Sequence, residues 1–294
     1  MNNRKRQVLE HAQQLFLEKG AAATSIQDIL TKANISKGTF YNYFSSKNDC
    51  LKAIVTLGEE ETHLRREELL IGQDRTDKEI FVQQIAVRVQ VNSDHNLIPI
   101  IEAIFHSGEN DLSEFARKSH LKELHWIANR FVDMYGEKMK TYAADCAVLF
   151  IGMLQHTLYF RKSNMTKNYE PIDVTRYIMR RIDQMIPSMM ATDDALFGES
   201  LFQVIHAQDG ADELLMEDIL ERLASFHQQL QREKDEENSQ FVTFLQDELI
   251  AEAPRLQLIE AILRSFRQAF KDTPHEFTVI KLISDIWIHL QSEA

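Results

Sequence analysis

The stretch of sequence over residues 33–47 reads ANISKGTFYNYFSSK, and it decides how the first part of the chain folds. The pair Asn34-Ile35 predicts a tight break between two helices, because Asn tolerates the left-handed backbone conformation better than most residues. Ser36 stands where a cap is needed at the start of a short helix over 37–43. The stretch therefore predicts a turn followed by a short, capped helix.

Two further helices are expected immediately before this stretch. Ser25 precedes an apolar helical stripe over 26–33, and Asp28 follows Ser25 by three residues, which is the spacing of a capping box. An earlier amphipathic stripe begins near Val8 and ends at Gly20. Eight apolar side chains of this segment are expected to form a small core: Val8, Leu15, Phe16, Ile26, Ile29, Ile35, Phe40 and Phe44.

Three helices of this size match a helix-turn-helix, in which the second helix of the pair enters the major groove of DNA. Here the supporting helix is 26–33 and the reading helix is 37–43. The polar side chains expected on the outer face of the reading helix are Lys37, Thr39, Tyr41, Asn42 and Tyr43. Lys supplies charge for phosphate or guanine, Thr a methyl group for thymine, Asn an amide for adenine, and Tyr a hydroxyl for phosphate. Gly38 removes a side chain where backbone must approach DNA closely.

The order of these residues closely resembles the DNA-binding domain of the TetR family. The resemblance rests on Gly20, Ser25 and Ile29, then on the block from Ala33 to Phe44 and on Ser46-Lys47. One departure is Asn34, where the family usually has Gly, and Asn also accepts a left-handed backbone. The resemblance implies the following DNA contacts: Ser25 and Ser36 on phosphates at helix N-termini, Lys37, Gly38 and Thr39 at base edges, Asn42 as a further reader, and Tyr41, Tyr43 and Lys47 on phosphates.

An ordinary structural role is the alternative for this face. Tyr41 and Tyr43 would then be core aromatics, and Lys37 and Lys47 would be solvated surface charges. Because the whole run has the required order as well as the required composition, it favours DNA contact over this alternative.

Charge is distributed unevenly along the chain. The formal net charge is −12, yet residues 1–50 hold seven Lys/Arg against four Asp/Glu, while residues 193–294 hold 8 against 21. An acidic body repels DNA everywhere except at a basic face, which helps to orient the encounter. Only the N-terminal segment is therefore suited to face phosphate.

Composition indicates a folded protein without a membrane segment. Apolar residues make up 44% and charged residues 27% of the 294 residues, which is an ordinary balance for a soluble chain. Cys50 and Cys146 lie far apart, and no apolar leader follows the basic start, so a disulfide framework is not expected. The longest apolar run, over 147–154, is too short to span a bilayer. We expect a cytoplasmic protein with no membrane contact.

The remaining segments have helical periodicity, and no segment alternates as a strand does. Helices are expected over 47–70, 77–91, 97–107, 111–136, 141–163, 171–190, 210–234, 239–252, 254–271 and 274–291. The expected fold class is all-α. It comprises a helix-turn-helix domain over 1–47, a helical effector-binding and dimerisation domain over 48–192, and an additional acidic helical region over 193–294.

The resemblance also implies roles for the middle domain, namely binding of a small-molecule effector and homodimerisation through two long helices, here 141–163 and 171–190. A two-fold dimer would bury the apolar first helix and place two reading helices about 34–36 Å apart on operator DNA. A monomeric core helix is the alternative. Candidate effector contacts, which could equally be plain core residues, are Phe105, His106, Trp126, Met153, His156 and Tyr159.

No metal or other cofactor is expected, and neither is an enzyme. His120 and His125 are five residues apart, which misses the i,i+4 spacing of a helical zinc site, and Cys50 fits a structural thiol better than a redox sensor. The chain contains no HExxH, GxSxG, phosphate-loop or dinucleotide motif. A helical interaction scaffold would not need the Lys37-Gly38-Thr39 sequence. The sequence therefore predicts a transcriptional regulator, with ligand-released repression as the default that the family implies.

The last hundred residues extend beyond the point, near residue 190–200 of this numbering, where family members commonly end. An apolar stripe predicts that they pack: Leu214, Leu215, Ile219, Leu223, Phe226 and Leu230. An enlarged effector or dimer domain, a docking surface and simple stabilising mass are all possible roles, and we favour the first. The segment 256–265 resembles 98–107, but amphipathic helices share letters by chance, and we prefer chance to duplication.

Overall fold

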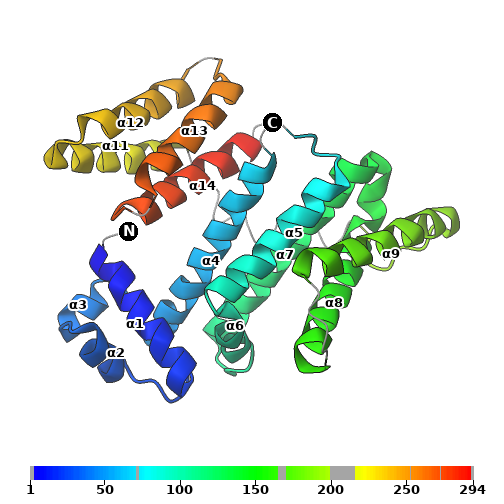
Figure 1. The fold of residues 1–294 in the computed structure, drawn as a ribbon, viewed down its shortest axis with the longest axis horizontal. Helices are drawn as coiled ribbons and strands as arrows, with labels where there is room; N and C mark the ends of the chain where they lie inside the picture. Colours follow the sequence, from blue (N-terminus) through cyan, green and yellow to red (C-terminus); the bar gives the residue numbers. More distant parts are fainter. Residues whose placement is uncertain are drawn as a thin grey trace. The chain divides into compact units, whose positions relative to one another are not determined.

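The computed structural model describes residues 3–70, 73–164, 170–198, 216–251, 253–271 and 273–292. These residues form α-helices joined by short turns, with one 3-10 turn and no strand among them (Figure 1). The all-α fold class is therefore confirmed. Start signals in the local sequence explain why most helix bounds agree with the expected ranges. Pro171, for example, occupies the first position of its helix, as predicted.

The N-terminal part of the chain forms the expected helices. α1 (Asn3–Lys19) ends at Gly20, whose positive φ of 84° suits glycine. It is followed by α2 (Ile26–Ala33), α3 (Lys37–Tyr41) and α4 (Lys47–Leu70). α3 is two residues shorter than predicted. The amides of residues 43 and 44 both donate to the Phe40 carbonyl at 2.9 Å, and this tightens the chain into a turn before α4.

The chain divides into two compact units, one containing Met1–Leu64 with Asp212–Ala294 and the other Arg65–Ala211. α4 is one continuous helix that contributes residues to both units. This division differs from the three predicted domains, which were drawn by expected function and stay a prediction. Its main consequence is that the C-terminal helices belong to the same unit as the helix-turn-helix.

The C-terminal helices of this first unit are α11 (Met216–Glu233), α12 (Glu236–Leu249), α13 (Leu256–Phe270) and α14 (Glu276–Ser292). The predicted apolar stripe is buried at each of its four described positions, and Leu214 and Leu215 lie outside the described residues. The helices share one core with Leu64 of α4: Ile219, Leu223, Phe226, Leu230, Val242, Leu245, Leu249, Ile259, Leu263, Phe266, Phe270, Val279, Ile280, Leu282, Ile283 and Ile286.

The structure tests two expectations for this region, the start of the last helix and the similarity between two segments. α14 begins at Glu276, two residues later than predicted, because Thr273 and Pro274 lie in a turn in which the Thr273 hydroxyl donates to the Phe270 carbonyl at 2.7 Å. The similarity between 98–107 and 256–265 does not extend to packing. Phe105 is 54% exposed, whereas its counterpart Leu263 is 2% exposed. This difference favours chance resemblance over duplication.

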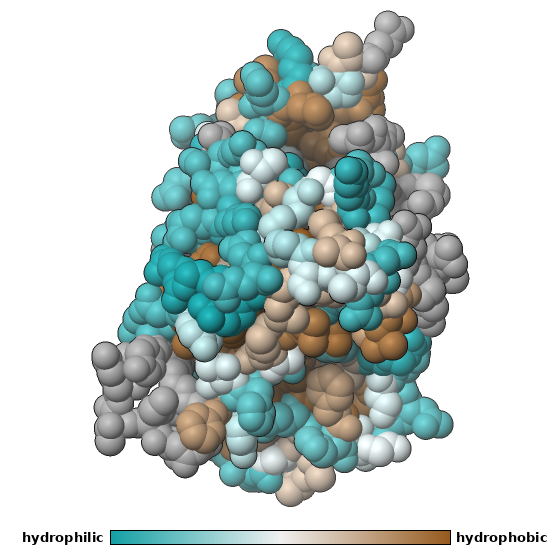
Figure 2. Space-filling view, turned by 90° about the vertical axis from the view of Figure 1, so that its right-hand side faces the viewer, coloured by the Kyte–Doolittle hydropathy of each residue, from teal (hydrophilic) through white to brown (hydrophobic). Residues whose placement is uncertain are grey.

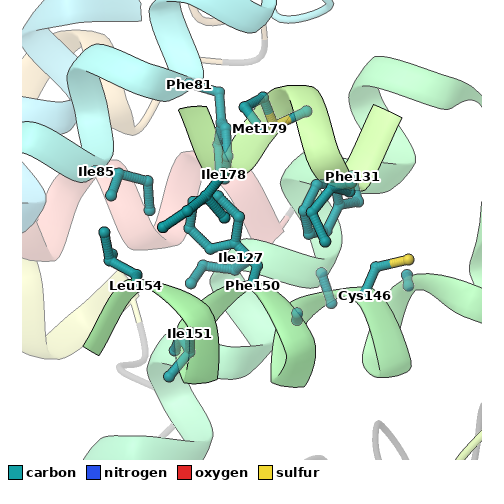
Figure 3. Packing of buried hydrophobic residues seen from close by; sticks show 14 of the residues in the cluster. Phe81, Ile85, Ile127, Phe131, Cys146, Phe150, Ile151, Leu154, Ile178 and Met179 are labelled. Atoms are coloured by element: carbon teal, nitrogen blue, oxygen red, sulfur yellow. The ribbon is translucent and has the colours of Figure 1, made fainter. Parts of the chain in front are cut away.

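The second unit contains α5 (Lys78–Asp94), α6 (Leu97–Phe105), α7 (Asn110–Tyr135), a 3-10 turn (Glu137–Met139), α8 (Lys140–Asn164) and α9 (Pro171–Thr192). Their core is rich in aromatic residues (Figure 3). The Phe81 ring centroid lies 5.5 Å from that of Phe131 and 5.3 Å from that of Phe150. These rings join α5, α7 and α8, and apolar residues of α9 such as Ile178 complete the same core.

The segment Glu137–Phe160, which includes most of α8, is long and apolar enough to cross a membrane by length and composition alone. One such helix is weak evidence for a membrane protein, because the core helix of a soluble protein passes the same test. Here Cys146, Ala147 and Phe150 of this helix are fully buried in the core of the second unit. Core packing is thus sufficient to explain its apolar character.

Candidate nucleic-acid interface

Side-chain caps fix the two helices of the predicted reading motif. The Ser25 hydroxyl accepts from the amide of Asp28 at 3.1 Å, and the Asp28 carboxylate accepts from the amide of Ser25 at 2.9 Å, so the expected capping box is present. The Ser25 hydroxyl and the Lys19 ammonium also hold the pKa of the Asp28 carboxyl well below its usual range. α2 therefore begins at a defined residue.

The turn between α2 and α3 has the geometry that the sequence predicted. Asn34 closes α2 in the left-handed conformation, with φ of 49° and ψ of 56°. Ser36 then caps α3 by accepting from the Thr39 amide at 3.1 Å, and its hydroxyl lies 2.9 Å from that of Thr39. Because both the amide and the hydroxyl of Thr39 contact the Ser36 cap, the start of this short helix is set locally.

The inner side of α3 is anchored by aromatic residues. Phe40 is fully buried and Phe44 is 4% exposed, and their ring centroids are 5.5 Å apart. Six of the eight predicted core residues are buried, and Ile26 and Ile35 are half-buried. The helix is therefore buried on this side, and its opposite side remains at the surface.

The outer side of α3 contains the residues that the sequence assigned to DNA. Lys37, Gly38, Tyr41 and Asn42 are exposed, and Thr39 and Tyr43 are half-buried. Tyr41 keeps 45% of its surface accessible, a large value for an aromatic side chain. The Lys37 ammonium lies 5.9 Å from the Tyr41 ring centroid. The two helix caps, Ser25 and Ser36, are exposed as well.

Lys47 has a structural task that sequence reasoning missed. Its ammonium donates to the Ala21 carbonyl at 2.7 Å and to the Thr24 carbonyl at 2.9 Å, which fastens the start of α4 to the loop before α2. The Thr24 hydroxyl in turn donates to the carbonyls of Leu15 and Gly20. An ammonium group has three N–H donors, so one remains for the predicted phosphate contact.

Gly38 has no structural requirement for glycine within the protein. Its backbone is helical, and a Cβ atom added there would meet only the Ser36 hydroxyl oxygen, at an ordinary distance of 3.8 Å. The space above this residue is open. If glycine is required at this position, the requirement must therefore come from a molecule that binds over it.

Cys50, at the start of α4, is fully buried, and burial raises the pKa of its thiol to about 12. The thiolate that redox chemistry requires is therefore scarce near neutral pH. Among the described residues, no three His, Cys, Asp or Glu side chains are grouped to hold a metal ion.

The last turn of α4 contains a buried ionic cluster in the second unit. The guanidinium of Arg66 donates twice to the Glu123 carboxylate, at 2.7 and 2.9 Å, and stacks 3.6 Å from the Trp126 ring centroid. Arg88 pairs with the same carboxylate at 2.6 Å. Although burial opposes ionisation, the two guanidinium groups lower the pKa of Glu123 to about 2. The side chain of Gln84 donates to the Arg66 carbonyl at 2.9 Å.

The six candidate effector contacts do not all share one environment. Trp126 and Met153 are partly buried at the edge of the core of the second unit. Phe105, His106, His156 and Tyr159 are exposed, and Tyr159 reaches 70%. Only the first two occupy positions where a ligand could be enclosed by neighbouring side chains.

The capped, outward-facing α3 on an aromatic anchor defines a helix-turn-helix DNA-binding protein. Residues 8–54 match the model of the family described as bacterial regulatory proteins, tetR family. The HTH-type transcriptional regulator YerO of Bacillus subtilis (strain 168), itself uncharacterized, is 25% identical over 90% of this chain and 89% of its own length. YuxN of the same organism is 24% identical over 92% of this chain and 94% of its own length.

Two further similarities concern parts of the chain. The HTH-type transcriptional repressor DhaR of Mycobacterium sp. (strain GP1) is 45% identical over 40 residues, which are 14% of this chain and 20% of DhaR. A transcriptional regulator from Aquifex aeolicus VF5 aligns in structure with a TM-score of 0.45 at 17% identity, over 62% of this chain and 99% of its own. The N-terminal residues 8–54 thus form a DNA-binding domain of the TetR family, and the relatives that match the whole chain are HTH-type transcriptional regulators, so this chain is a DNA-binding transcriptional regulator.

Proposed function

We propose that this regulator is a homodimeric repressor, located in the cytoplasm, that a small-molecule effector releases from its operator. The observation that carries the proposal is the outer side of α3. Lys37, Tyr41 and Asn42 are exposed there above a buried phenylalanine anchor, and the open space over Gly38 lets a DNA backbone approach. Nine residues form the proposed DNA contact: Ser25, Ser36, Lys37, Gly38, Thr39, Tyr41, Asn42, Tyr43 and Lys47.

Homodimerisation is supported by apolar surface on α8 and α9. Leu149 is 41% exposed, Phe160 51% and Tyr177 51%. Figure 2 shows one face of the protein, on which apolar patches lie among polar surface. Exposed aromatic and aliphatic side chains grouped on two helices are typical of an interface between subunits.

Release by an effector is supported by the continuity of α4. The helix begins beside α3 and ends in the Arg66–Glu123 cluster, where Arg66 stacks on Trp126. A ligand that enters near Trp126 and Met153 would disturb this cluster and tilt α4. Coupling between an effector and operator binding is typically worth about 1–3 kcal/mol.

The proposal is tested by the binding of purified protein to a labelled duplex, measured by fluorescence anisotropy while candidate effectors are titrated. The duplex comes from the region upstream of the protein's own gene. We expect an amphipathic ligand to weaken binding, and sedimentation should give a dimer both with and without it. A monomer that binds DNA with full affinity, or binding that no amphipathic cation, acyl-CoA or aromatic drug alters, would contradict the proposal.

A further inference from the structure

The four C-terminal helices are attached to α4, the helix that follows the reading motif. Leu64 of α4 is 1% exposed, and it lies in the core formed by α11 to α14. One turn earlier, the Glu60 carboxylate lies 3.5 Å from the Lys281 ammonium of α14. A second link joins α1 to the start of α14, where Arg6 and Glu276 approach to 3.9 Å.

The two attachments of α4 within the first unit are separated along the helix. Near its beginning, Cys50, Leu51, Ile54 and Val55 are buried with at most 4% of their surface exposed. Leu64 follows Val55 by nine residues, which is about 14 Å along a helix axis. The bundle therefore contacts α4 at a point well along the helix from the part that follows the reading motif. A small rotation of α4 about this contact would displace α3 appreciably.

The attachment of α4 to the bundle includes an ion pair beside the apolar contact of Leu64. Glu60 and Asp285 are both largely buried, and burial raises the pKa of each carboxyl. Asp285 is paired with Arg222 of α11 at 2.5 Å, and Lys281 also acts on it electrostatically. Lys281 is 51% exposed and Glu60 only 18%, so their ion pair lies at the edge of the contact and contributes little net stability, but the largely buried Glu60 carboxylate has its counter-ion on the bundle. Together with Leu64, which is buried in the bundle core, this contact favours one orientation of α4 on the bundle.

We propose that the C-terminal bundle is a positioning element of the DNA-binding unit, and that Glu60 and Leu64 set the orientation of α4, and through it of α3, by contact with Lys281 and the bundle core. The bundle thereby acts on operator affinity directly, and not through the effector-binding half of the chain. Glu60, Leu64 and Lys281 are positioning residues, since none of them lies on the outer side of α3.

A charge-swap experiment on the full-length chain tests this inference. The variants are Glu60→Lys, Lys281→Glu and the double variant, and the probe is a duplex that the wild-type protein selects from a random-sequence pool. Each single reversal should weaken binding about fivefold or more, in the range of typical couplings between sites. The double variant, which restores an ion pair of opposite polarity, should recover most of the affinity.

Glu248→Gln is the matched control for an effect on stability alone. Glu248 pairs with Arg255 at 2.6 Å inside the bundle, away from α4 in sequence, and its carboxylate also accepts from the Arg255 amide. This variant should lower the melting temperature yet bind the selected duplex as the wild type does. The inference is overturned if the two single reversals bind the duplex with wild-type affinity, as Glu248→Gln is expected to do. It is also overturned if the double variant does not recover the affinity that the single variants lose.

Discussion

The buried ionic cluster at the end of α4 allows a quantitative prediction for Glu123→Gln. Glu123 has an ordinary pKa of 4.5, and the guanidinium groups of Arg66 and Arg88 lower it to about 2 in the folded protein. Each pKa unit is worth about 1.4 kcal/mol, so ionised Glu123 stabilises the second unit by about 3 kcal/mol at neutral pH. Gln cannot carry the charge and would leave Arg66, only 4% exposed, without its counter-ion.

The sign of the pH dependence follows from the lowered pKa. A carboxyl whose pKa is lower in the folded state contributes its full stability above the unfolded pKa and loses it as pH falls towards the folded value. The difference between wild type and Glu123→Gln should therefore be constant near neutral pH. It should shrink between about pH 4.5 and pH 2.

Urea unfolding followed by tryptophan fluorescence measures this difference. The chain has two tryptophans, Trp126 and Trp287, so a Trp287→Phe background leaves Trp126 as the reporter within the second unit. Glu114→Gln is the control, because Glu114 lies on the same helix and pairs with Arg117 at the surface, where an ion pair is worth little. The reasoning fails if Glu123→Gln unfolds like the control, or if its deficit is as large at pH 3 as at pH 7.

Three further predictions concern other parts of the molecule. Gly38→Ala should fold with an unchanged melting temperature, because the added Cβ has room, but it should bind DNA more weakly; equal affinity in a gel shift would remove the case for close backbone approach. Leu149→Asp should shift sedimentation towards a monomer without unfolding the protein, since Leu149 is already 41% exposed. Cys50 should resist alkylation by iodoacetamide at pH 8 in the folded protein, because burial keeps its thiol protonated, and rapid labelling would argue against that burial.

Sequence reasoning predicted the helix-turn-helix in detail because its determinants are local. Ser25, Asn34 and Ser36 act on backbone groups within a few residues, so their spacing alone indicates where α2 and α3 begin and end. The end of α3 was misplaced, since the turn after Tyr41 depends on how Phe44 must pack rather than on helix periodicity. Local signals do not contain that constraint.

Long-range partners were not predictable in the same way. Leu64 resembles any other apolar residue of a helical stripe, and nothing nearby in sequence indicates that its neighbours come from residues beyond 216. Arg66 and Glu123 are 57 residues apart in sequence. Both are charged, and charged side chains are usually exposed. The fit of whole helices decides which of their faces meet. For this reason the association of the C-terminal helices with the DNA-binding unit became visible only in the structure.

The central claim is that the outer side of α3 reads DNA sequence, and one measurement tests it most directly. Wild-type protein and Asn42→Ala are each used to select duplexes from the same random pool, and the affinity of the wild type for its own duplex is then followed against salt concentration. The account predicts a defined wild-type sequence, affinity that falls steeply with salt, and a changed preference at discrete positions for Asn42→Ala. Recovery of the same sequence by both proteins, or no salt-sensitive affinity for any duplex, would contradict it.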